Sequence, residues 1–180
     1  TARIKALSPR RVLEVGCGTG LLMGRIAPSC ERYVGTDFSP AVLSHTKRLV
    51  AAMPELSHVE LLQGTADQLD GFDEGAFDTV ILNSVVQYFP SMDYLAAVLD
   101  AVARVVVPGG HVYIGDVRNH DLLEAYAASV EASPLPPETA RETLAGQTAQ
   151  RVQREEELTI SPRFFAAWRE TRPEVTGVWI

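Results

Sequence analysis

Residues 12–20 read Val-Leu-Glu-Val-Gly-Cys-Gly-Thr-Gly, an apolar run that leads directly into three glycines at alternate positions. Glycines let the backbone approach a ligand closely and turn into a helix N-terminus. A dinucleotide fingerprint, G-x-G-x-x-G, needs a small residue at its last position. Counted from Gly16 that position is Leu21, and counted from Gly18 it is Met23. The stretch therefore predicts a buried strand, a ligand-binding turn and a helix, and its spacing disfavours a nicotinamide-dependent oxidoreductase.

The composition is that of one globular domain. The chain has 180 residues, of which 46% are hydrophobic and 22% charged, close to the average soluble protein. Its 16 Lys and Arg against 23 Asp and Glu give a net charge of −7, so we expect no nucleic-acid partner. No apolar run approaches the length of a membrane span. Cys17 and Cys30 form no CxxC pair, and we expect reduced thiols in a cytoplasmic protein.

Strand-like apolar runs alternate with segments of helical period along the chain. The expected strands are residues 11–15, 32–36, 59–63, 77–82, 111–115 and 175–180. The expected helices are residues 21–27, 40–52, 93–107, 121–132 and a short one from 162. Ser39-Pro40 gives an N-cap with proline at the first helical position. This order predicts an α/β fold, a Rossmann-like, doubly wound and mostly parallel sheet.

We expect a single domain over residues 1–180, with a core at 10–133. From Pro134 the amino-acid composition changes. The prolines of Pro134-Leu-Pro-Pro137 interrupt regular secondary structure, and residues 138–157 are polar and compatible with a helix. We interpret residues 134–172 as an insertion or lid over one sheet edge. Because the chain ends on an apolar, strand-like run, we interpret it as a piece of something larger.

An acid stands where an adenosine site needs one. Asp37 ends the second expected strand, about 20 residues past the glycine turn, so its carboxylate can accept both ribose hydroxyls. Taken alone, Asp37 is also suited to cap the helix that starts at Ser39-Pro40. Together with the glycine turn, the ligand-binding interpretation is the stronger one.

These features resemble a class I S-adenosylmethionine-dependent methyltransferase over nearly the whole chain. The motif is Glu-x-Gly-x-Gly-x-Gly, followed by the acid after the second strand. The resemblance implies S-adenosylmethionine as cofactor and S-adenosylhomocysteine as product. It places the methionine part at the glycine turn, the ribose at Asp37, the adenine at residues 64–67 and the sulfonium at residues 83–85. The implied cofactor-binding residues are Glu14, Gly16, Cys17, Gly18, Gly20, Asp37, Phe38, Thr65, Ala66, Asp67, Asn83, Ser84 and Val85.

Four segments make the resemblance specific to one group of methyltransferase domains. They are residues 83–91 (NSVVQYFPS), 115–119 (GDVRN), 155–158 (EEEL) and 161–165 (SPRFF). They are similar to methyltransferase domains embedded in nonribosomal peptide synthetases. This implies N-methylation of an aminoacyl thioester on a phosphopantetheinyl carrier domain, with neighbouring synthetase domains as partners. The family leaves open C-, O- or S-methylation of a small molecule or tethered intermediate, and a degenerate cofactor-binding module without turnover.

Two departures from the family pattern are visible. Little precedes the first expected strand, where the family carries N-terminal helices. The chain also ends at the sixth expected strand, so we expect the usual seven-stranded sheet to be truncated at its C-terminal strand.

The candidate catalytic residues follow the fourth and fifth expected strands, where open α/β sheets bind ligands. They are Asn83, Gln87, Tyr88 and Asp116. The first three can offer an oxygen to an amine, and Asp116 is the candidate for receiving the proton. The structural alternatives are that Tyr88-Phe89 are core aromatics and that Asp116 is an ion partner of Arg118 or a hydrogen-bond acceptor that orders its loop.

Cysteine and histidine chemistry is not expected at this site. The helix start that follows Cys17 should lower the pKa of its thiol, but we interpret Cys17 as a small filler residue. No group of His, Cys and Asp has metal-ligand spacing, so we expect no metal.

Overall fold

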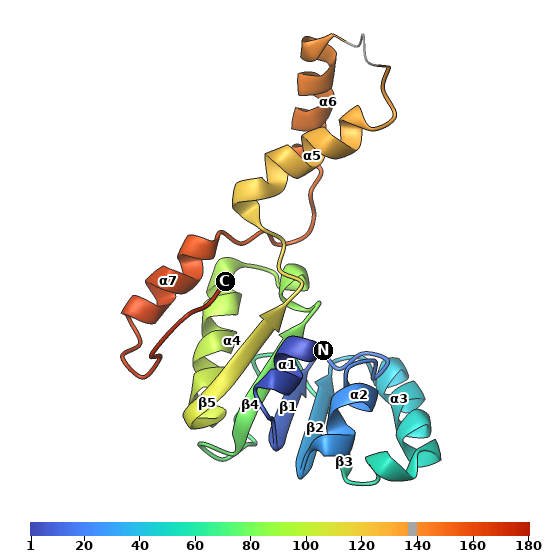
Figure 1. Ribbon diagram of the computed structural model, residues 1–180, viewed down its shortest axis with the longest axis vertical. Coiled ribbons are helices and arrows are strands. Elements are labelled where there is room, and N and C mark those ends of the chain that lie inside the picture. The colour runs from blue at the N-terminus through green and yellow to red at the C-terminus, as the bar shows by residue number, and fades with distance from the viewer. Residues whose placement is uncertain (137–139) are drawn as a thin grey trace. The chain divides into compact units, whose positions relative to one another are not determined.

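The computed structural model describes residues 1–136 and 140–180 (Figure 1). This part of the chain divides into two compact units. The first comprises Thr1–Val86 with Asp93–Asp116, and the second comprises Gln87–Met92 with Val117–Ile180. Pro137 and Glu138, which entered the expected chain break and helix, lie outside the described residues. Within the described ranges, no helix is long and apolar enough to cross a bilayer.

Five parallel strands form the sheet of the first unit, in the spatial order β3-β2-β1-β4-β5. They are β1 (Arg11–Val15), β2 (Arg32–Asp37), β3 (Val59–Gln63), β4 (Phe77–Asn83) and β5 (Val106–Gly115). The order reverses beside β1, which pairs with both β2 and β4. This confirms the doubly wound α/β sheet, and its switch point places a ligand crevice at the carboxyl ends of β1 and β4.

Helices lie before and between these strands. They are α1 (Ala2–Ala6), α2 (Met23–Ile26), α3 (Pro40–Ala52) and α4 (Met92–Val105), with short 3-10 turns η1 (Ala27–Ser29), η2 (Pro54–Leu56) and η3 (Val86–Tyr88). Three of the helices, α2, α3 and α4, were expected from the sequence, whereas α1, before the first strand, was not. The predicted cap of α3 is present, since the Ser39 side chain accepts from the Val42 N–H and Pro40 opens the helix. Right-handed crossovers put α2 and α3 on the sheet face opposite α4.

The boundary between α4 and β5 differs from the prediction. The expected helix ran to Val107 and stopped at Pro108-Gly-Gly110, but α4 ends at Val105 and β5 begins at Val106. Val106 pairs with Phe77, and the register then shifts so that His111 pairs with Thr79. Residues 107–110 therefore interrupt a strand instead of ending a helix. Proline has no N–H to give a ladder and Gly109 has a φ of +80°.

The expected sixth strand at residues 175–180 is wrong. No strand is formed there, and Trp179 and Ile180 are 85% and 82% exposed. A strand is stabilised by pairing with a neighbour, and no described strand pairs with this run. Apolar composition alone therefore did not suffice to predict a strand.

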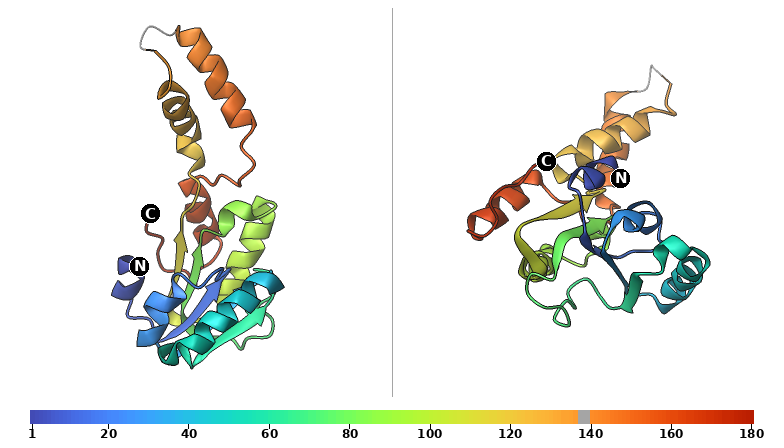
Figure 2. Two further views of the ribbon diagram at one scale, coloured as in Figure 1. Left: turned by 90° about the vertical axis from the view of Figure 1, so that its right-hand side faces the viewer. Right: turned by 60° about the horizontal axis from the view of Figure 1, so that its bottom comes forward.

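The second unit contains the remaining helices. They are η4 (His120–Leu122), α5 (Leu123–Ala132), α6 (Arg141–Gln153) and α7 (Pro162–Glu170). Helices α5 and α6 pack against each other (Figure 2), and Arg151 forms an ion pair with Glu131 across them at 2.9 Å. The expected helix after Ser161 is confirmed, with the Ser161 side chain accepting from the Arg163 N–H.

Candidate functional site

Three left-handed glycines form the turn after β1. Gly16, Gly18 and Gly20 have φ values of +71°, +51° and +80°, which L side chains rarely adopt. A Cβ on Gly16 would overlap the side chain of Val85 from the end of β4. A Cβ on Gly18 would meet nothing within 4 Å. The turn therefore packs tightly against Val85 and leaves open space over Gly18, as a ligand cradle requires.

Asp37 and Thr46 fix this turn from the neighbouring strand and helix. The Gly18 N–H donates to Asp37 Oδ2 at 3.0 Å, and the Thr46 hydroxyl donates to the Gly18 carbonyl at 2.7 Å. The Ser39 N–H donates to Asp37 Oδ1 at 2.9 Å, so the acid also orders the start of α3. A carboxylate oxygen has two acceptor positions. Each oxygen of Asp37 therefore keeps one for a ligand hydroxyl, which fits the ribose of S-adenosylmethionine.

Glu14 is a buried acid beneath the turn. Glu14 is 4% exposed, and its carboxylate accepts a hydrogen bond from the Tyr33 hydroxyl at 2.7 Å. Burial raises the pKa of Glu14 to about 7, and the Tyr33 hydrogen bond partly opposes that rise. Glu14 can therefore change protonation state near neutral pH.

Cys17 does not have the lowered pKa expected of a thiol at a helix start. Burial, followed by the charges of Glu14 and Asp37, raises the pKa of its thiol to about 12. A thiol that stays protonated at neutral pH is a poor nucleophile. This supports the interpretation of Cys17 as a small filler residue.

The residues implied to flank an adenine lie beside Asp37. The Gly64 N–H donates to the Asp37 carbonyl at 3.1 Å, which joins the end of β3 to the end of β2. Asp67 accepts from the hydroxyls of Thr65 at 2.6 Å and Tyr94 at 2.7 Å. These two hydrogen bonds lower the pKa of Asp67. Phe38 is 72% exposed and so presents an apolar surface.

A chain of hydrogen bonds links the carboxyl ends of β4 and β5. The Asn83 side-chain amide donates to Ser84 Oγ at 3.0 Å, and the Ser84 hydroxyl donates to Asp116 Oδ2 at 2.9 Å. Ser84 and Asp116 have φ values of +57° and +59°. Such strained positions cluster at functional sites. The structure therefore brings Asn83, Ser84 and Asp116 together, as their places after the two strands predicted.

Gln87 and Tyr88 belong to the second unit. The Gln87 residue is 4% exposed, and its side-chain oxygen Oε1 is buried without a hydrogen-bond partner among the described residues. Tyr88 is 71% exposed and Phe89 only 9%. The alternative that both are core aromatics is therefore wrong for Tyr88.

Arg118 is not the partner of Asp116. Its guanidinium forms ion pairs with Glu155 at 2.8 Å and Glu157 at 3.0 Å. Asp116 instead accepts from the Ser84 hydroxyl. The ion-pair alternative for Asp116 is therefore wrong, whereas the alternative of an acceptor that orders its loop agrees with this hydrogen bond.

Three residues of this site were missed in the sequence. Tyr33, Thr46 and Tyr94 donate hydrogen bonds to Glu14, Gly18 and Asp67 respectively. Thr46 lies inside the predicted helix 40–52, and its full burial is visible only in the folded structure. The two tyrosines fit their strand and helix as ordinary apolar positions, so only the folded register reveals them.

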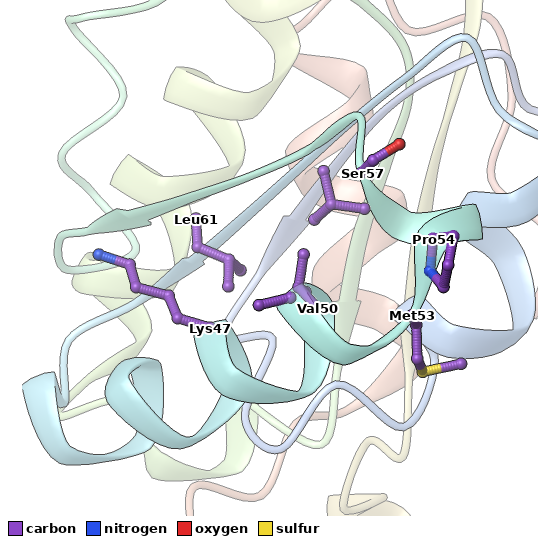
Figure 3. Close-up of a pocket in the computed structure, with 8 residues that line it drawn as sticks. Lys47, Val50, Met53, Pro54, Ser57 and Leu61 are labelled. Carbon is purple, nitrogen blue, oxygen red and sulfur yellow. The ribbon is translucent and has the colours of Figure 1, made fainter.

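A separate hollow lies away from the crevice. Figure 3 shows it between the C-terminal half of α3, η2 and β3, with Val50, Met53 and Leu61 among its lining residues. It includes Val59, the first residue of β3. It therefore lies toward the amino end of the sheet, opposite the carboxyl ends that hold the glycine turn and Asp37.

Comparisons with known proteins agree with this geometry. A family model described as a methyltransferase domain matches residues 13–114. The chain is 48% identical over 176 residues to chondramide synthase of Chondromyces crocatus, covering 98% of this chain and 4% of that protein. It is 34% identical over 168 residues to the beauvericin nonribosomal cyclodepsipeptide synthetase of Beauveria bassiana, covering 93% and 5%. The chain thus spans at most 5% of the length of these two curated relatives.

A solved structure gives the same answer for the fold. The chain is similar to CalS10, an S-adenosylmethionine-bound amino pentose methyltransferase from Micromonospora echinaspora, with a TM-score of 0.56 and 26% identity, covering 67% of this chain and 49% of that one. The open glycine turn and the free acceptor positions of Asp37 suit the same cofactor. This chain therefore belongs to the methyltransferase domain family, as a class I S-adenosylmethionine-dependent methyltransferase.

Proposed function

We propose that this chain methylates the α-amine of an aminoacyl thioester held on a phosphopantetheinyl carrier domain, in nonribosomal peptide biosynthesis. The observation that carries the proposal is the similarity to chondramide synthase over 98% of this chain and to a nonribosomal cyclodepsipeptide synthetase over 93% of it. Neighbouring synthetase domains are the partners that belong to the same proposal. A cytoplasmic setting belongs to it too, and the free thiols of Cys17 and Cys30 fit that setting.

The work left to the protein is alignment and removal of one proton. S-adenosylmethionine, when bound, supplies an electrophilic methyl group on a positively charged sulfur. Holding the amine in line can contribute up to about 7–11 kcal/mol of the barrier. An α-amine has a pKa of about 8, so a useful fraction is already neutral. The chain therefore needs a hydrogen-bond acceptor for the amine more than it needs a strong base.

Asp116 is the proposed proton acceptor. In our proposal the new N–C bond would form as the methyl–sulfur bond of the donor breaks and its sulfur leaves as a neutral thioether. The amine nitrogen would then be positively charged, and its extra proton would pass to the Asp116 carboxylate. The Ser84 hydroxyl holds Asp116 Oδ2 at 2.9 Å and is itself held by Asn83. This chain of donors fixes the orientation of the carboxylate. In our proposal the side-chain carbonyl of Asn83 accepts a second hydrogen bond from the amine.

Gln87 is the proposed orienting residue. A buried acceptor without a donor costs about 1–3 kcal/mol, and Gln87 Oε1 is such an atom. An amine N–H would satisfy it, and this satisfaction would favour acceptors that carry a free N–H. The exposed Tyr88 hydroxyl is the proposed third contact to the acceptor.

The test is a methylation assay with a blocked control. The chain is mixed with S-adenosylmethionine and a carrier protein loaded with an aminoacyl group, and intact mass is followed. We expect one methyl group on the free amine and none on the same carrier after N-acetylation. Asp116→Asn keeps the shape of the side chain and should lower the rate by about 10²-fold.

Other outcomes would contradict the proposal in different ways. Methylation of the N-acetylated carrier would point to a carbon, oxygen or sulfur acceptor. Binding of S-adenosylhomocysteine without methylation of any loaded carrier would identify a cofactor-binding module without turnover.

A further inference from the structure

We propose that Arg118 is a positioning residue, which sets the place of Gln87 through Glu155, Glu157 and Leu158. The inference rests on the proposed function, because it concerns the residue that would orient the amine. All of these residues lie in the second unit. We refer to Arg118 and residues 155–160 as the Arg118 clamp.

The side chain of Arg118 binds residues 155–160 through two of their carboxylates. A terminal guanidinium nitrogen lies 2.8 Å from Glu155 Oε2, and its Nε lies 3.0 Å from Glu157 Oε2. The guanidinium also sits 5.2 Å from the ring centroid of Tyr126 on α5. The rigid, planar guanidinium of arginine can bind two carboxylates at once through different nitrogens, whereas the single ammonium of lysine cannot reproduce this geometry.

The backbone of Arg118 binds the other end of residues 155–160. The Ile160 N–H donates to the Arg118 carbonyl at 2.8 Å, and the His120 N–H donates to the Ile160 carbonyl at 3.2 Å. Asn119 and Ile160 form a parallel bridge between these two bonds. Residues 155–160 are therefore fixed at both ends against residues 118–120.

Leu158 lies between these two attachments and carries the link to Gln87. Its N–H donates to the Gln87 carbonyl at 2.7 Å. The position of this N–H depends on Glu157 before it and Ile160 after it, both of which Arg118 holds. The side chain of Gln87 has a buried oxygen without a partner. Its direction is therefore set by where its backbone is held.

A matched control lies in the same unit. Arg151 pairs with Glu131 at 2.9 Å between α6 and α5, an ion pair of the same kind with no hydrogen bond to Gln87 or residues 155–160 among those described. Partly exposed ion pairs contribute little to global stability. Replacement of either arginine should therefore leave the protein folded, and only replacement of Arg118 should reach Gln87.

The experiment compares Arg118→Met, Arg118→Lys and Arg151→Met by two measurements. The first is hydrogen exchange of the Leu158 amide, which needs no substrate. We expect at least tenfold faster exchange in Arg118→Met, an intermediate rate in Arg118→Lys and no change in Arg151→Met. The second is methylation of the loaded carrier. Because small misplacements can cost about 10²-fold, we expect kcat to fall about 10- to 100-fold in Arg118→Met. The affinity for S-adenosylhomocysteine should stay within about twofold, since its implied contacts lie elsewhere.

Each result decides one of the two proposals. Unchanged exchange at Leu158 in Arg118→Met, or a kcat that falls no further than in Arg151→Met, would overturn the positioning role. Faster exchange at Leu158 together with a wild-type chain that methylates no carrier would support the link to Gln87 and overturn the proposed function.

Discussion

The glycines of the turn after β1 make separable contributions to stability and binding. Gly16→Ala and Gly18→Ala both place a side chain at positive φ, which costs about 1–2 kcal/mol. Only Gly16→Ala also drives a Cβ into Val85, and overpacking adds about 1–3 kcal/mol. We expect urea unfolding to show the larger loss for Gly16→Ala. Gly18→Ala should lose at least tenfold in S-adenosylhomocysteine affinity, because its methyl group enters the open space. Unchanged binding by Gly18→Ala would place the cofactor elsewhere.

Glu14 makes the stability of the fold depend on pH. Its pKa is about 7 in the folded chain, against a usual value near 4.5. Between these values the folded state binds more protons than the unfolded state. The contribution of Glu14 to stability is therefore fully present below about pH 4.5 and is lost as pH rises through about 7, by about 3 kcal/mol. Glu14→Gln removes the titration and keeps an acceptor for Tyr33.

The measurement for Glu14 is urea unfolding of wild type and Glu14→Gln at about pH 5 and pH 8. We expect the loss of stability between the two pH values to be smaller in the variant, because the other titrating groups are shared. An equal loss in both proteins would mean that Glu14 is ionised throughout.

Single residues were predictable from sequence where chain spacing alone places them. Asp37 follows the glycine turn by a length that one helix and one strand require, so its place at the turn was predicted. The Tyr33 hydroxyl meets Glu14 only because neighbouring strands β1 and β2 pair Glu14 with Gly35 and Val12 with Tyr33. Such a partner depends on strand register, which the local sequence does not encode.

At the scale of elements, the interruption of β5 at residues 107–110 is closely packed within the sheet. A Cβ on Gly110 would lie 2.7 Å from the backbone oxygen of Asp78 and 2.6 Å from Val106 Cγ1. We expect Gly110→Ala to destabilise the chain by about 1–3 kcal/mol in urea unfolding. Gly71→Ala is the control, since a Cβ there meets nothing within 4 Å. Equal effects of the two substitutions would show that the strand relaxes around the added methyl group.

The elements that were predicted wrongly from the sequence are those whose structure depends on pairing between strands. The Ser39 cap and Pro40 mark the start of α3 in the sequence itself, so the first residue of this helix was predicted without any distant contact. Val106 and Val107 continue the apolar pattern of α4, and only the ladder with Phe77 makes Val106 the start of a strand. Residues 175–180 have the composition of a strand, but no described strand pairs with them. Local pattern therefore identified the helices better than the edges of the sheet.

At the scale of the whole molecule, the doubly wound sheet followed from the alternation of strands and helices. The division into two units did not follow from it, because Gln87–Met92 groups with residues far along the chain. Hydrogen bonds such as that from Leu158 to Gln87 create this grouping. The interpretation of residues 134–172 as an insertion or lid stays a prediction, and residues 155–160 of the Arg118 clamp lie within this segment.

Ligand binding should stabilise the molecule unevenly. Every residue implied to contact the cofactor lies within Thr1–Val86, in the first unit. A ligand at 100 times its Kd adds about 2.7 kcal/mol, which corresponds to a rise in Tm of roughly 5–10 °C for a chain of this size. We expect S-adenosylhomocysteine to give this rise and NADH to give none. If the thermogram resolves two transitions, only that of the first unit should move.

Asp37 decides whether this stabilisation comes from the predicted site. Asp37→Ala removes the acceptors for Gly18 and Ser39 together with those left for the ribose, whereas Asp37→Asn keeps one carbonyl oxygen. Hydrogen bonds to a charged group contribute about 1.5–3 kcal/mol each. The rise in Tm should therefore vanish in Asp37→Ala and shrink in Asp37→Asn, as differential scanning calorimetry would measure. A full rise in Asp37→Ala would mean that the ligand binds without the acid at the end of β2, and the cradle would have to be sought away from the switch point of the sheet.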